Sequence, residues 1–174
     1  MHKMILGSIE VLHELVQLVK ALDDKNYNCS PKPLFNSSIG SHVRHILDIY
    51  QALMRAENNL IDYDFRRRGN PIETQCSAAL KEMKEIENWL LTLKEEQFSD
   101  LKTVKTEVCL SQRHSEKFTS TLGREVFFAS SHVTHHVALI VAIAKSLNIK
   151  INNQLGIAPA TSTFLRKTAL SAAN

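Results

Sequence analysis

Glycine and proline are scarce in this chain of 174 residues, which contains five Gly and four Pro. Because these two residues interrupt regular secondary structure most strongly, their scarcity leaves long uninterrupted segments. In those segments apolar residues recur at the 3.6-residue spacing of an amphipathic helix. The sequence therefore predicts a mostly helical protein.

Cysteine is also scarce: Cys29, Cys76 and Cys109 are far apart and form no C-x-x-C pair. Their odd number and wide spacing argue against a disulfide framework and against a zinc ribbon. The first 20 residues are apolar but are interrupted by charges such as Glu10 and Lys20, which neither a signal peptide nor a membrane span tolerates. We expect a protein of the reducing cytoplasm with no membrane partner.

The chain has little net charge, +3 at pH 7, whereas nucleic-acid binding needs a concentrated basic face. Its one basic run, Arg66 to Arg68, comes just after Tyr63 and Phe65. These arginines could bind an acidic substrate or the carboxylates of a thiol cofactor, or they could lie in a solvated loop and pair with surface glutamates. We expect a small-molecule substrate and no nucleic acid.

Four segments carry helical periodicity, at about residues 3–23, 38–59, 71–95 and 122–147. Between about 100 and 122 polar and apolar residues alternate instead, which predicts a β-hairpin or an extended crossover. The chain closes with a loop that can hold one more short helix. Four long helices, two of them joined by a long connection, predict an all-α four-helix bundle that forms a single domain over residues 1–174.

The segment "SHVTHHVALIVAIA", residues 131–144, places three histidines beside an apolar run. His132 and His136 are four residues apart, so in a helix they lie on the same face, directed at the interior. A buried imidazole needs a partner for each ring nitrogen, and a shared divalent ion supplies one to both residues. The same spacing also occurs without a metal. The remaining isolated histidines are expected at the surface: His2, His13 and His114.

A third histidine on another helix favours the metal site. His45 lies beside Ile46 in the predicted helix 38–59, which a bundle can bring against the last long helix. His42, one turn earlier, borders the same apolar stripe and can replace His45. His135 can replace His136 for the same reason, and periodicity alone does not choose between them.

Four segments in order carry a family resemblance: "SIGSHVRHILDIYQAL", "YDFRRRGNPIET", "GREVFFASSHVTHHVALI" and "LGIAPATSTF". Over about residues 5–165 the chain resembles the DinB-like, or YfiT-like, metalloenzyme superfamily of helical bundles. In that family one metal-binding histidine comes from the second helix and two come from an H-x-x-x-H pair in the fourth. The resemblance implies His45, His132 and His136 as metal ligands. His42 then becomes a neighbour, at a position where many relatives carry an apolar or aromatic residue.

Three imidazoles leave coordination positions of a divalent ion open for water or substrate. Zinc or nickel suits imidazole best, with iron as a further option. Relatives include S-transferases and isomerases that use a low-molecular-weight thiol. The resemblance therefore implies a metal-dependent hydrolase or a thiol S-transferase, which we expect to be a homodimer as many relatives are. The alternative is a non-catalytic bundle that binds a metal or a partner.

The sequence offers weak candidates for further roles in such a site. Asp48, one turn after His45, can orient a ligand or accept a proton, or can be an ordinary helix aspartate. Glu125 can reach the interior or stabilise a helix start. Cys109 can be a nucleophile or a small core residue. None of them is assigned a catalytic role.

Overall fold

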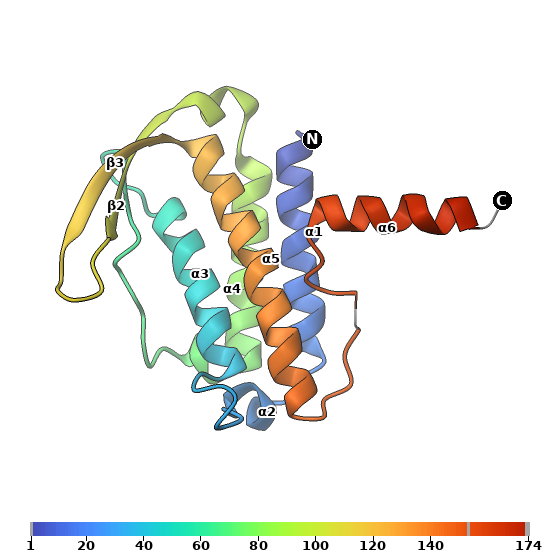
Figure 1. Cartoon of the computed structure of the whole chain (residues 1–174). Coiled ribbons are helices and arrows are strands. Elements are labelled where there is room, and N and C mark those ends of the chain that lie inside the picture. The colour runs from blue at the N-terminus through green and yellow to red at the C-terminus, as the bar shows by residue number, and fades with distance from the viewer. Residues whose placement is uncertain (1, 153, 173–174) are drawn as a thin grey trace.

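The computed structural model describes residues 2–152 and 154–172. Four long helices lie side by side (Figure 1): α1 (Lys3–Lys20), α3 (Ile39–Met54), α4 (Cys76–Thr92) and α5 (Leu122–Ser146). Helix α1 packs on α4 and α5, and α3 packs on the same two helices, so that each helix contacts two neighbours. The predicted four-helix bundle is confirmed.

Helix starts mostly follow the capping signals, while three helices end earlier than expected, at Lys20, Met54 and Thr92. Ser38 caps α3 by accepting a hydrogen bond from the Ser41 amide at 3.1 Å. The helix expected from residue 71 instead begins as a 3₁₀ turn, η1 (Pro71–Glu73), and α4 starts only at Cys76. A further short helix, α2 (Asp24–Asn28), was not predicted, because five residues are too few to show a period.

The connection between α4 and α5 contains the predicted hairpin. After a 3₁₀ helix, η2 (Glu95–Ser99), strands β2 (Leu101–Glu107) and β3 (Ser115–Thr121) pair antiparallel. Strand β1 (Leu60–Asp62) adds a parallel partner to β2, giving the order β1-β2-β3. A strand of three residues carries no detectable alternation, so β1 could not be predicted. The hairpin leads directly into the first turn of α5, beside α3 (Figure 1).

Gly40 fixes the start of α3 against η1. A Cβ atom at this position would lie 2.0 Å from the Glu73 carbonyl oxygen and 2.8 Å from the Tyr27 ring. Only glycine allows this close approach of the two backbones. The turn before α4 is therefore packed tightly on the start of α3, at Gly40, which shortly precedes His42 and His45.

The last helix, α6 (Pro159–Ala172), projects away from the bundle (Figure 1). It exposes the large apolar side chains Phe164, Leu165 and Leu170. By length and composition alone, α5 is apolar enough to cross a membrane, but half of its most apolar stretch is buried inside the protein. That burial is typical of the core helix of a bundle.

Candidate metal centre

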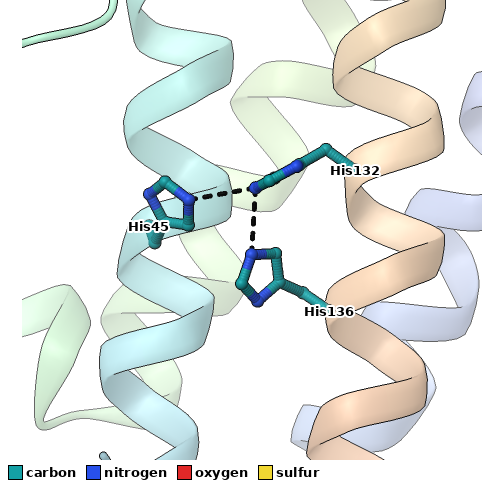
Figure 2. A group of neighbouring side chains, drawn as sticks. All are labelled: His45, His132 and His136. Atoms are coloured by element: carbon teal, nitrogen blue, oxygen red, sulfur yellow. Dashed lines mark hydrogen bonds between the residues drawn. The ribbon is translucent and has the colours of Figure 1, made fainter. Parts of the chain in front are cut away.

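Three histidines from two facing helices converge in the bundle, His45 from α3 and His132 and His136 from α5 (Figure 2). The Nε2 atom of His132 lies 3.0 Å from Nε2 of His45 and 2.9 Å from Nε2 of His136. His136 is buried and the other two are half-buried. One ring nitrogen of each residue lies within 4.8 Å of the other two. The structure therefore brings together the three residues that the resemblance implied as ligands.

Hydrogen bonding alone does not satisfy this cluster. The Nε2 atom of a neutral imidazole carries either one proton or one lone pair, yet Nε2 of His132 faces two nitrogens. One divalent ion would satisfy all three. Nitrogens bound to an ion at about 2.1 Å lie about 3.0 Å apart at the roughly 90° angle of an octahedral site and about 3.4 Å apart in a tetrahedral zinc site, close to the two separations seen here. The donor set and its spacing fit a divalent metal.

His42 lies behind the cluster and contacts it through a different nitrogen. Its Nδ1 atom is 3.1 Å from Nδ1 of His136, and its Nε2 atom is 2.7 Å from the hydroxyl of Ser37. The ring nitrogen of His136 that faces His42 is thus the one that does not face His132. Periodicity left His42 and His45 as alternative ligands. In the structure both residues lie next to His136, but on different sides of the contact with His132.

The surroundings of the cluster favour the neutral form of its imidazoles. Burial, reinforced first by His132 and then by His45 and His42, lowers the pKa of His136 to about 3. Burial and then the Arg66 charge lower the pKa of His45 to about 4. Burial also lowers the pKa of His42 and His132. Neutral imidazole is the form that binds a metal, so these rings are ready to coordinate at neutral pH.

The metal-free protein is expected to lose stability as the pH falls from 7 to 5. Below about pH 6.5 histidines of the unfolded chain take up protons, whereas His45 and His136 stay neutral in the folded chain down to about pH 4 and 3. The free energy of unfolding therefore falls, by at most about 2 kcal/mol for each of the two histidines at pH 5 because solvent screens their exposed edges, and has no such dependence above pH 7. Urea unfolding at both pH values measures it.

Carboxylates contribute to acid sensitivity with the same sign, so the control is a His136→Leu variant. Its stability should fall less between pH 7 and pH 5 than that of the wild-type chain. Equal pH dependence of the two proteins would show that burial of His136 contributes nothing to acid unfolding.

Asp48 lies in a buried ion-pair network. Its carboxylate is 3.0 Å from Nη1 of Arg44 and 2.7 Å from Nε of Arg67. Arg67 also binds both carboxylate oxygens of Glu82, at 2.7 and 2.9 Å. Both acceptor oxygens of Asp48 are therefore engaged by guanidinium groups, and the residue is not a member of the trihistidine cluster.

Two other candidates also lie outside the cluster. His135 is exposed and borders a groove between α1 and α5, with its ring centroid 6.1 Å from that of His132. Cys109 is half-buried in the turn after β2, because that strand ends at Glu107. Cys109 thus lies in the segment predicted as a hairpin or crossover, but in the connection between its two strands.

Glu125 is fully buried in a cleft between the hairpin and α5. It accepts hydrogen bonds from the hydroxyl of Tyr63 at 2.7 Å and from Ser120 at 2.6 Å, and it pairs with Arg124 at 2.7 Å. Phe128 continues this stripe of α5 toward the histidines, with its ring 5.6 Å from that of His132. The spacing 128, 132, 136 predicts Phe128 on the same helix face as the two histidines, whereas sequence reasoning missed Tyr63 as a neighbour of the site.

The fold and the cluster together define a helical bundle with a trihistidine site between two helices. The sequence profile of the DinB superfamily matches residues 9–140. The chain therefore belongs to the DinB superfamily, and the family resemblance carried by the four segments is confirmed.

The chain is similar to known proteins in both structure and sequence. The structure of YfiT from Bacillus subtilis, described as a probable metal-dependent hydrolase with an unusual four-helix bundle topology, matches with a TM-score of 0.59 and 18% identity over 85% of this chain and 87% of that one. This likeness shows the fold. FK506-binding protein 5 from Rhizopus delemar is 32% identical over 111 residues, covering 62% of this chain. The match spans only 28% of that relative's length.

Proposed function

We propose that His45, His132 and His136 hold a divalent metal ion and that the protein is a metal-dependent hydrolase. The observation that carries the proposal is the convergence of three Nε2 atoms at 2.9 and 3.0 Å separations. Zinc or nickel suits three imidazoles best, with iron as the further option. When bound, such an ion supplies a Lewis acid that can polarise a carbonyl and lower the pKa of water. The structural likeness to YfiT supports this class.

We propose that His42 orients His136. If Nε2 of His136 is the ligand atom, its single proton is on Nδ1, which donates to Nδ1 of His42. The proton of His42 is then on Nε2, which donates to the Ser37 hydroxyl. Each contact then has one donor and one acceptor, so one set of tautomers satisfies the whole series of hydrogen bonds from His136 through His42 to Ser37. Such outer partners fix the ring of a ligand and strengthen it as a donor.

Among the described residues, no fourth protein ligand joins the cluster. Within the part of the chain that the structure describes, the group of candidate ligands has three members, and all are histidines. A site closed by a fourth protein ligand would favour a structural role, whereas three ligands leave room for a substrate. This supports an enzyme over the alternative, a non-catalytic bundle that binds a metal or a partner. A thiol S-transferase that uses a low-molecular-weight thiol is the second enzymatic candidate.

Purified protein is expected to contain about one divalent metal per chain and to hydrolyse esters or amides only when loaded. Elemental analysis gives the metal, and a panel of ester and amide substrates, assayed before and after chelation and reloading, gives the activity. Metal-dependent transfer of a low-molecular-weight thiol, without hydrolysis, would favour the S-transferase. A loaded protein that does neither would favour the binding module.

We further propose that residues 1–174 form one domain and that the protein is a cytoplasmic homodimer acting on a small molecule, without nucleic-acid or membrane partners. The exposed apolar residues of α6, Phe164, Leu165 and Leu170, support a second copy as partner. The three unpaired cysteines support a reducing compartment.

A further inference from the structure

Arg66 differs from its two neighbours in what it binds. Arg67 is engaged by Asp48 and Glu82, and Arg68 is exposed. Arg66 is half-buried, and its Nη1 atom donates to the carbonyl oxygens of Tyr63 and Phe65. Among residues 2–152 and 154–172, no carboxylate lies within 4.0 Å of its guanidinium nitrogens. Arg66 is thus a positioned cation without a protein counter-ion in the described chain.

One edge of the Arg66 guanidinium is unused. Of its five N–H groups, those on Nη1 bind backbone carbonyls, which holds the plane in place. Neither Nε nor Nη2 makes a hydrogen bond within the described residues, and neither atom is sealed from solvent. The Nε and Nη2 edge presents two parallel N–H groups, the geometry that binds both oxygens of a carboxylate.

The charge of Arg66 is near enough to the candidate metal centre to act on two of its histidines. After burial, its charge is the largest influence that lowers the pKa of His45, and it also acts on His132. Tyr63, whose carbonyl accepts from Arg66, has its ring 5.6 Å from Phe128, and Phe128 lies 5.6 Å from His132. Tyr63 therefore contacts Arg66 through its backbone and the histidine-bearing face of α5 through its ring.

The same Tyr63 is a wall of the cleft between the hairpin and α5. This cleft has a volume of about 450 Å³, and its walls combine aromatic and apolar side chains with hydroxyl groups. They include Tyr63, Val104, Phe118 and Phe128. The buried charge of Glu125 is already paired with Arg124, so the cleft adds no unpaired anion that would repel a negative ligand.

We propose that the site takes a small-molecule carboxylate with an aromatic or apolar body, bound by the free edge of Arg66 with its body against Tyr63 and Phe128. The inference deepens the proposed function, on which it rests, by naming the substrate class. A monoanion fits better than a phosphate dianion, because Asp48 and Asp64 already act on Arg66 and would oppose a second negative charge.

The test uses benzoate as the probe and the metal-free full chain, so that direct binding of benzoate to a metal cannot contribute. Calorimetric titration is expected to show saturable binding that is at least about tenfold weaker in Arg66→Gln and unchanged in Arg68→Gln. Arg66→Lys, which keeps the charge and loses the two-pronged edge, should be intermediate. Benzamide, the neutral analogue, should bind at least about tenfold more weakly than benzoate. Phe128→Ala should weaken benzoate more than acetate.

Equal affinity for benzoate in the wild-type chain and Arg66→Gln, or no binding to the wild-type chain, would overturn the inference. Tighter binding of inorganic phosphate than of benzoate would overturn the assignment to carboxylates. Zinc affinity is measured in parallel on the same proteins and should not be lowered by Arg66→Gln, because the substitution removes a positive charge that acts on His45 and His132. Failure of benzoate with normal zinc binding counts against Arg66 alone, whereas failure of zinc binding in the wild-type chain counts against the proposed function.

Discussion

Replacing His45, His132 or His136 by alanine is expected to lower the affinity for zinc by more than about 100-fold. Groups that only orient a metal ligand change affinity by about 10- to 100-fold, so loss of a ligand itself should cost more. The three Nε2 atoms lie next to one another, so removal of any one leaves only two imidazoles for the ion. Competition of each variant with a chromophoric zinc chelator measures the affinity.

The matched controls are histidines at other positions. His114→Ala should leave zinc affinity unchanged, because His114 is exposed and paired with Glu116 at 2.8 Å. His42→Phe should lower it by about tenfold, since it removes the acceptor for Nδ1 of His136 but no ligand atom. Wild-type affinity in any of the three alanine variants would remove that residue from the ligand set. A loss in His42→Phe as large as in His45→Ala would make His42 a ligand.

The helical bundle could be predicted because the sequence patterns of its long helices are local and repeated. Helical periodicity over 16 or more residues predicts α3 and α5, and a spacing of four residues puts His132 and His136 on one face of α5. The choice between His42 and His45 could not be made in this way. Both lie near the seam with α5, and only the rotation of α3 decides which ring reaches His132 and which reaches the far nitrogen of His136.

The roles of charged residues depended on segments that are distant in sequence. "RRR" is uniform as a sequence, yet Arg67 meets Asp48 and Glu82 while Arg66 meets backbone carbonyls. These partners are 19 and 15 residues away from Arg67, in two different helices. No local pattern contains that information. Local sequence also could not predict the role of Asp48. Its position one turn after His45 suggested a role at the metal, whereas in the structure it pairs with Arg44 and Arg67.

Asp48→Ala is expected to destabilise the protein by about 3–5 kcal/mol, which corresponds to a fall in melting temperature of about 10 °C. The carboxylate of Asp48 is fully buried, and its removal leaves Arg44, only 10% exposed, without a close counter-ion, while Arg67 keeps Glu82 but loses the partner of its Nε atom. The Nε atom of Arg44 already lacks a hydrogen bond. A charge left in that position loses more by desolvation than it recovers from Glu73, 3.6 Å away. Thermal and urea unfolding measure the loss.

The same variant separates a structural from a metal-site role for Asp48, provided that a milder substitution is included. Asp48→Asn keeps the volume and one acceptor oxygen, so this variant should fold and be less destabilised than Asp48→Ala. Its zinc affinity should stay within about threefold of the wild-type value, because Asp48 contributes no atom to the histidine cluster. Glu116→Gln is the matched control, since it breaks a surface pair that is about half exposed on both sides and should change stability by less than about 1 kcal/mol. If Asp48→Asn kept full stability but lost zinc, the carboxylate would belong to the metal centre and the ion-pair network would be incidental. The two guanidinium contacts require a different outcome: stability should depend on Asp48, and zinc binding should not.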